Sequence, residues 1–126
     1  MTNPIVFCWS QFLDVAKFLK EKGDDNILPC EAAYRCSISR AYYAAFGYSM
    51  NYAKDNLGYY PEHTGDDHRN IRDFYRSKGK NDISRRLDRL HQRRKNCDYD
   101  EPVYSLDLTI QDSFNEANYI IESLSH

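Results

Sequence analysis

Apolar residues recur at helical spacing along most of this chain, and no stretch shows the alternation of apolar and polar residues typical of a half-buried strand. The first apolar stripe follows the Asn3–Pro4 pair, which is typical of a helix start, and it ends before Gly23. Its apolar members are Phe12, Leu13, Ala16 and Leu19. The pattern therefore predicts a first helix in this region.

A second, longer helix is predicted from about Cys30 to Tyr52, after a turn-forming stretch over 23–29. Within it, only Gly47 interrupts the helical pattern. Its many alanines and serines would let a neighbouring helix approach closely, and its tyrosines supply bulk for a core.

Three shorter helices are predicted in the second half of the chain. One begins near Asp66 and ends in the SKGKN stretch over 77–81, and the next begins at Asp82. A last helix follows Pro102, where Thr109 and Asp112 resemble a capping box. Together these patterns predict an all-α bundle that forms a single domain over residues 1–126.

The net charge of −2 hides a strong polarisation along the chain. The stretch from Arg69 to Lys95 holds eleven Lys and Arg against three Asp and Glu, a balance of +8, while the remaining residues carry −10. Such a block fits either a site for a polyanion or a solvated helix face that balances acidic neighbours. The sequence leaves both interpretations open.

Several functional classes are disfavoured by motifs that the sequence lacks. It contains no membrane-length apolar run and no leader peptide, so we expect a soluble, cytoplasmic protein. Its four cysteines form no C-x-x-C pair and are expected to be reduced and mostly buried. It has no glycine-rich phosphate loop, and His63 and His68 alone make a weak metal site. We therefore expect no metal, no cofactor and no membrane partner.

Three segments resemble motifs of a known family. Residues 35–45 (RCSISRAYYAA), followed by Phe46, resemble the S-R-A-Y-Y-A-x-F signature in the second helix of HEPN domains, which are small helical bundles. Residues 94–99 (RKNCDY) resemble the R-x-x-A-D-Y segment of the HEPN subgroup often found beside minimal nucleotidyltransferases. Between them, His68 begins a stretch similar to the H-x-x-h-x-x-F segment of that subgroup, where h is apolar. The resemblance covers nearly the whole chain.

The resemblance implies a HEPN-like bundle of four or five helices that usually dimerises. In active members it implies a metal-independent ribonuclease with an R-x4-6-H motif, in which Arg stabilises phosphate charge and His has an acid-base or orienting role. This chain departs from that pattern, because Tyr99 stands five residues after Arg94, and Asp98 five after Arg93, where the family has histidine. The candidate catalytic residues are therefore Arg94, Tyr99 and Asp98.

A literal R-x4-H at Arg86 and His91 is the alternative catalytic pair. Five residues of regular helix rotate by about 140°, so the two side chains would diverge unless the helix bends. The competing interpretation is that both residues are simply exposed charged groups on the basic face of the predicted helix that begins at Asp82.

Other residues of these segments are expected to bind RNA or to support the fold. Arg40, amid small and aromatic residues, would need a carboxylate partner, for which Asp98 is the candidate, and a phosphate-facing role is the alternative. The full set is Arg40, Tyr43, His68, Arg93 and Lys95.

The favoured function is binding of RNA or of a nucleotidyltransferase partner, within a toxin–antitoxin or defence system and with a degenerate nuclease motif. Tyr99 matches the tyrosine that the resemblance implies as an adenylylation target. An active metal-independent HEPN ribonuclease toxin is the alternative, and a purely structural bundle is a third possibility. We expect a homodimer through the helices that carry the two longer motifs, with RNA and a nucleotidyltransferase-type antitoxin as further partners.

Overall fold

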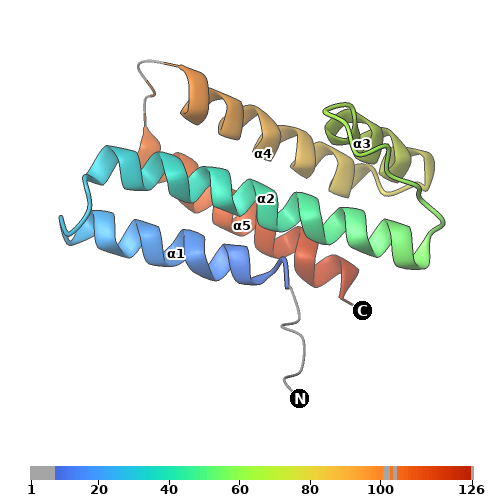
Figure 1. The fold of residues 1–126 in the computed structure, drawn as a ribbon, viewed down its shortest axis with the longest axis horizontal. Coiled ribbons are helices and arrows are strands. Elements are labelled where there is room, and N and C mark those ends of the chain that lie inside the picture. Colours follow the sequence, from blue (N-terminus) through green and yellow to red (C-terminus); the bar gives the residue numbers. More distant parts are fainter. Residues whose placement is uncertain (1–7, 101–102, 104, 126) are drawn as a thin grey trace.

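The computed structural model describes residues 8–100, 103 and 105–125, and these residues form five helices and no strand (Figure 1). The helices are α1 (Gln11–Asp24), α2 (Cys30–Asn56), α3 (Asp67–Ser77), α4 (Asn81–Tyr99) and α5 (Leu106–Leu124). This architecture confirms the predicted all-α bundle. None of the helices in the described part of the chain is both long and apolar enough to cross a lipid bilayer.

The long helix α2 runs through the middle of the bundle and contacts each of the other four helices. In Figure 1, α1 and α4 flank it on opposite sides and α5 passes behind it. Helix α3 packs mainly against α4 and makes a smaller contact with α2. Helices α2, α3 and α4 therefore come together at one end of the molecule.

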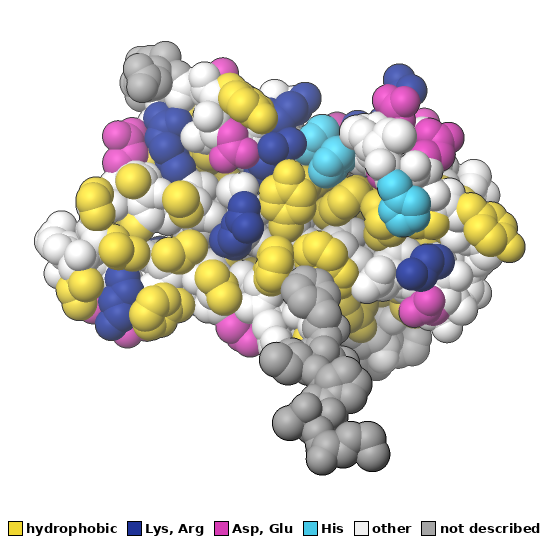
Figure 2. All heavy atoms as spheres, viewed as in Figure 1, with side chains coloured by type: hydrophobic (Ala, Val, Ile, Leu, Met, Phe, Trp, Pro, Cys, Tyr) yellow, Lys and Arg dark blue, Asp and Glu magenta, His cyan; other side chains and the backbone are white. Residues whose placement is uncertain are grey.

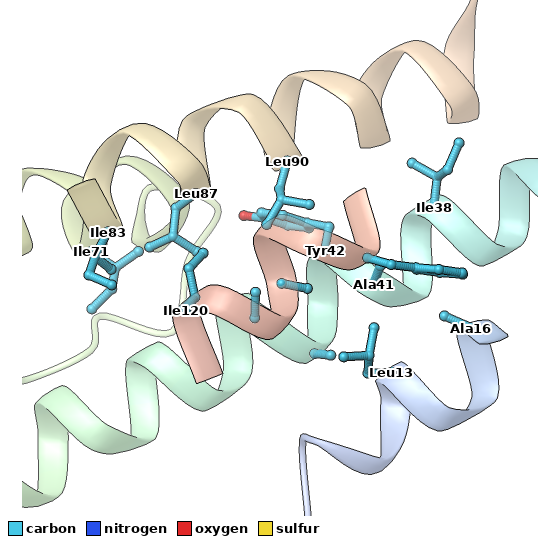
Figure 3. Close-up of a cluster of buried hydrophobic side chains, with 14 of the residues drawn as sticks. Leu13, Ala16, Ile38, Ala41, Tyr42, Ile71, Ile83, Leu87, Leu90 and Ile120 are labelled. Atoms are coloured by element: carbon cyan, nitrogen blue, oxygen red, sulfur yellow. The ribbon is translucent and has the colours of Figure 1, made fainter. Parts of the chain in front are cut away.

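Small residues on α2 permit this close packing. Ala41, Ala44 and Ala45 are fully buried, so neighbouring helix backbones approach α2 closely. Larger side chains from several helices fill the remaining space (Figure 3): Ile38, Tyr42, Leu87, Leu90 and Ile120. The interior is thus built around one face of α2.

The chain before α1 packs against α2 at Gly47. A Cβ atom at this position would overlap the indole ring of Trp9. Trp9 in turn packs edge-on against Phe12, with their ring centroids 5.1 Å apart. Glycine is needed here for space, and the start of α1 is positioned by this contact.

Helix α5 begins earlier than its sequence signals indicate. Ser105, the residue before the helix, has a left-handed φ of 56°. Thr109 already lies in the first turn, where its hydroxyl donates to the backbone carbonyl of Ser105 over 3.0 Å. The capping box predicted from Thr109 and Asp112 is therefore wrong. The predicted start of the first helix at Asn3–Pro4 lies outside the described residues.

The cysteines differ from the sequence-based expectation. All four are free thiols, but only Cys97 is buried, while Cys8 is half-buried and Cys30 and Cys36 are exposed. The prediction that most of them are buried is wrong, because Cys30 and Cys36 lie on the edge of α2 that faces away from the core. Burial raises the pKa of the Cys97 thiol to about 11.

The methyl group added by Gly47→Ala must displace the Trp9 ring, because its Cβ would lie 2.0 Å from a ring carbon, and we expect this to cost about 2–3 kcal/mol. After the roughly 1 kcal/mol that alanine gains over glycine inside a helix, the net fall in the free energy of unfolding is about 1–2 kcal/mol. Urea unfolding followed by the fluorescence of the chain's one tryptophan measures the change. Gly65→Ala, where a Cβ meets no atom within 4 Å, is the control. Equal stability of Gly47→Ala and the wild type would contradict this packing.

Candidate functional site

Histidine, arginine and aromatic side chains gather where α2, α3 and α4 meet. Helix α3 contributes His68 and Arg72, and α4 contributes His91 and Arg94. We call these four residues the histidine–arginine cluster. On the face of the molecule shown in Figure 2, histidine side chains lie at the surface beside hydrophobic and basic side chains. The supporting aromatic rings from α2 are Tyr42, Tyr43 and Phe46.

Helical periodicity explains why these side chains converge. Each helix contributes a pair of residues three or four positions apart, which puts both members on one face. The pairs are Tyr42 and Phe46 on α2, His68 and Arg72 on α3, and His91 and Arg94 on α4. Packing of the three helices brings the three faces together.

The imidazole rings of His68 and His91 stack on each other, with centroids 4.8 Å apart and planes 3° from parallel. His68 also stacks on Phe46, at 4.3 Å between centroids, and His91 stacks on Tyr42 at 5.1 Å. The Tyr42 hydroxyl forms a hydrogen bond with Nδ1 of His68. The aromatic face of α2 thus holds both histidines in place.

Arg72 determines the protonation pattern of the His91 ring. Its Nη1 donates to Nδ1 of His91 at 3.1 Å and to the backbone carbonyl of His68 at 2.9 Å. A guanidinium can only donate, so Nδ1 of His91 is the acceptor, and the proton of the neutral ring lies on Nε2. His91 therefore presents an N–H donor, while its basic nitrogen is already bound.

Burial and positive charge keep both histidines neutral at pH 7. Burial lowers the pKa of His91 to about 4, and the positive charges of Arg72 and Arg94 contribute to this shift. Burial and the same two arginines also lower the pKa of His68. Burial raises the pKa of Tyr42, so its phenol stays protonated and can serve as a donor.

Arg94 lies against the aromatic rings of α2 and is oriented by one ion pair. Its guanidinium carbon is 5.8 Å from the ring centroid of Tyr42 and 5.5 Å from that of Tyr43, within cation–π range. Its Nη1 donates to Oδ2 of Asp98 at 3.1 Å. Its Nε is buried and lacks a hydrogen-bond partner among the described residues. With a side chain only 12% exposed, Arg94 is a pre-oriented cation.

The ion pair predicted between Arg40 and Asp98 does not form. Asp98 pairs with Arg94, which precedes it by four residues on the same helix, so the two side chains meet without a contribution from α2. The guanidinium of Arg40 instead lies 5.4 Å from the ring centroid of Tyr43 and 5.9 Å from that of Phe12.

The alternative pair, Arg86 and His91, is not brought together. The guanidinium carbon of Arg86 lies 3.8 Å from the ring centroid of Tyr119 on α5. His91 faces α2 and α3 instead, where it is half-buried in the histidine stack. The expected divergence of the two side chains is confirmed, but His91 is not simply an exposed charge.

The remaining candidates are spread along α4. Tyr99 is the last residue of this helix and is 76% exposed. Lys95 is exposed as well, and its positive charge helps to lower the pKa of His91, after burial as the main cause. Arg93 and Arg89 both pair at 2.5 Å with Glu116 of α5. None of the described hydrogen bonds, ion pairs or ring contacts joins Tyr99 to the histidine–arginine cluster.

Five of the eleven Lys and Arg side chains over 69–95 form ion pairs, namely Arg72, Arg76, Arg89, Arg93 and Arg94. Besides the pairs with Glu116, Arg72 lies 3.6 Å from Asp88 and Arg76 lies 3.2 Å from Asp73. On the face shown in Figure 2, basic and acidic side chains are interspersed. This face therefore carries no uniform positive surface.

Asp67, directly before His68, ties the preceding loop to α3. Its carboxylate accepts the backbone N–H groups of Glu62 at 2.9 Å and His63 at 2.8 Å, and the Tyr59 hydroxyl at 3.4 Å. Burial alone would raise the pKa of this carboxyl, but the hydrogen bonds outweigh burial and hold the pKa below its ordinary value. The position of His68 is thereby fixed at the start of α3.

Arg72 and Asp67 were missed by reasoning from the sequence. The signal for Arg72 was its spacing of four residues from His68. Asp67 gave no comparable signal, because its partners are backbone groups of a loop.

Among the residues that the structure describes, no three or more His, Cys, Asp and Glu side chains gather as a metal-ligand group. Comparison of the chain with protein-family models, with curated proteins and with solved structures finds no match.

We expect the stability of the protein to fall between pH 7 and pH 4, partly through His91. Its pKa is about 4 in the folded protein against an ordinary value of 6.5, so the unfolded chain takes up the proton first. The contribution of neutral His91 to the free energy of unfolding is therefore complete above pH 6.5 and is lost as the pH falls toward 4. In His91→Gln, which does not titrate, the difference in unfolding free energy between pH 7.0 and 4.5 should shrink by about 1–2 kcal/mol, measured by urea unfolding.

The matched control for this experiment is His63→Gln. The His63 side chain is exposed on the loop before α3 and takes no part in the ring stack. The same pH dependence in both variants would contradict the burial of His91.

Proposed function

We propose that this protein is a HEPN-type bundle that binds RNA at the histidine–arginine cluster. One observation carries the proposal: residues of all three family-like segments meet in space. Tyr42 comes from the S-R-A-Y-Y segment, and it contacts both His68 of the H-x-x-h-x-x-F segment and Arg94 of the RKNCDY segment. Such convergence from three helices is what a shared binding site requires.

The chemistry of the cluster suits a phosphodiester. The guanidinium groups of Arg72 and Arg94 provide charged donors for phosphate oxygens, and their orientations are set by other side chains. Nε2–H of His91 adds a neutral donor. The partly exposed ring of Tyr43 offers a surface on which a base can stack.

The low pKa and the hydrogen bonding of the histidines favour RNA binding over rapid RNA cleavage. An imidazole with a pKa of about 4 is a weak base at neutral pH, and Nδ1 of His91 is already occupied by Arg72. Tyr99, which stands where the family has histidine, is exposed outside the cluster. These features support an RNA-binding protein with a degenerate nuclease motif.

A toxin–antitoxin or defence setting with a nucleotidyltransferase partner belongs to the same proposal. Tyr99 is 76% exposed, so its hydroxyl is accessible to an enzyme that would adenylylate it. A homodimer through α2 and α4, the helices that carry the two longer motifs, is also part of the proposal, as the resemblance implies.

We expect Arg94→Ala to weaken the binding of single-stranded RNA on the order of tenfold, and to reduce the salt dependence by about one phosphate contact. Fluorescence anisotropy with a labelled RNA at two salt concentrations measures both, and circular dichroism confirms that the variant is folded. Arg86→Ala is the matched control, because Arg86 lies on the same helix but contacts Tyr119 of α5. Equal weakening in both variants would refute the placement of the site.

A second candidate function is metal-independent RNA cleavage. It is favoured by one observation, the presence of two neutral imidazoles beside two arginines. For cleavage, one imidazole would have to accept the proton of a ribose 2′-hydroxyl as its oxygen bonds to phosphorus. The bond from phosphorus to the 5′-oxygen would break, the 5′-oxygen would take a proton from water, and an arginine would stabilise the negative charge on the non-bridging phosphate oxygens. His68 and His91 are the only described histidines in the cluster, so they are the residues to test.

We expect purified wild-type protein in EDTA to cleave RNA very slowly or not at all, because the basic nitrogen of His91 is occupied. Gel analysis of a labelled RNA over several hours measures this, with Tyr99→Phe as an accompanying variant that should behave as the wild type. Robust cleavage that both His91→Ala and His68→Ala abolish, and that Arg86→Ala leaves intact, would instead establish a ribonuclease centred on the cluster.

A further inference from the structure

A pocket opens beside the histidine–arginine cluster, on the surface between α1, α2 and α4. Its volume is about 420 Å³, and it is lined by Leu19, Cys36, Ser39, Arg40, Tyr43 and Asp98. We call it the Asp98 pocket. Apolar and aromatic groups dominate its wall, and one carboxylate and one guanidinium provide charge, which is the usual composition of a site for a small planar ligand.

Arg94 connects this pocket to the cluster. Its Nη1 holds Oδ2 of Asp98 at 3.1 Å, and its guanidinium carbon lies 5.5 Å from the ring centroid of Tyr43. The ring of Tyr43 lies 6.3 Å from that of His68. One nucleotide can therefore reach both places, with its phosphate at the cluster and its base in the pocket.

Two groups in the pocket keep hydrogen-bonding capacity that the bundle does not use. Asp98 binds Arg94 through Oδ2, and within the described residues no hydrogen bond is made by its Oδ1. The guanidinium of Arg40 rests on the rings of Tyr43 and Phe12 and forms no ion pair in the described part of the chain. An acceptor and a set of donors thus face the same space.

The geometry points to a nucleobase subsite in the Asp98 pocket, with guanine as the base that fits it. This inference rests on the proposed RNA binding and names the base that the site selects. Guanine presents two acceptors, N7 and O6, which a guanidinium such as that of Arg40 can bind as a pair. Its N1–H and N2–H groups are donors for Oδ1 of Asp98, and the apolar wall of the pocket can contact the faces of the base.

The other bases match this pair of groups less well. Adenine carries an amino group where guanine has O6, so a donor of the base would face the donors of Arg40. Cytosine and uracil lack the N7 acceptor and have a smaller ring to stack. A carboxylate and a guanidinium in one pocket therefore select guanine.

A second copy of the chain is the competing occupant. The surface next to the pocket is an apolar hollow lined by α1, by Leu28 of the connection that follows it, and by the start of α2, including Ala32. An apolar interface there would leave Arg40 and Asp98 partly desolvated without partners from the other copy, which is unfavourable. The charged groups of the pocket thus favour a polar, planar ligand.

The test compares the oligoribonucleotides UUGUU and UUUUU by fluorescence anisotropy. We expect the wild type to bind UUGUU on the order of tenfold more tightly. Leu19→Trp, which fills the pocket from α1, should bring the ratio of the two dissociation constants close to one. Leu28→Trp is the matched control, because Leu28 lines the neighbouring hollow and not the Asp98 pocket, and it should keep the preference.

A footprint on the exposed thiols locates the base. Cys36 lines both the Asp98 pocket and the neighbouring hollow, whereas Cys30 lines neither, although both are exposed on α2. Saturating UUGUU should therefore slow alkylation of Cys36 and leave that of Cys30 unchanged. Equal, salt-dependent binding of both oligonucleotides would overturn the guanine subsite alone, whereas no binding of either would overturn the proposed function as well. Protection of Cys36 that rises with protein concentration in the absence of RNA would assign the pocket to a second copy.

Discussion

The close approach of neighbouring helices to the alanine-rich side of α2 is the constraint on which the site depends. Ala41, Ala44 and Ala45 are fully buried, and substituents much larger than a methyl group would push α1, α4 and α5 apart. With small residues on the inner side, the bulky residues of α2 lie toward its edges. Tyr42 is buried facing α3 and α4, while Tyr43 remains partly exposed. Core packing therefore determines where the aromatic support of the cluster lies.

Electrostatics then determines which groups of the half-buried histidine–arginine cluster are charged and which are neutral. Arg72 and Arg94 each lie near a carboxylate, Asp88 and Asp98 respectively. The histidines have no such carboxylate within ion-pair distance among the described residues, so burial and the arginine charges lower their pKa values and they lose their protons. Neutral rings can stack without charge repulsion, and this is the arrangement seen for His68 and His91. The neutral state and the stack thus depend on each other.

Reasoning from the sequence succeeded where local periodicity or turn chemistry decides the outcome. The five helices follow from apolar spacing, and the turn after Ser77 and the long α2 lie where the pattern indicates. The partner of Asp98 could not be predicted, because a neighbour on the same helix competes with Arg40 on another. The exposure of Cys36 depends on which edge of α2 the other helices leave uncovered. The contacts of His91 could not be predicted either, because they depend on where α3 packs. The spacing of residues within α4 carries no information about that packing.

Glu116 has a consequence for the orientation of α4. This buried carboxylate of α5 binds Arg89 and Arg93, which lie one turn apart. Two anchor points on successive turns resist both the sliding of α4 and its rotation about its own axis. His91 lies between these arginines in the sequence and faces the other way, toward His68. Helix α5 contributes no side chain to the cluster, but through Glu116 it restricts the rotation of α4. It thereby determines the orientation at which the imidazole ring of His91 meets that of His68.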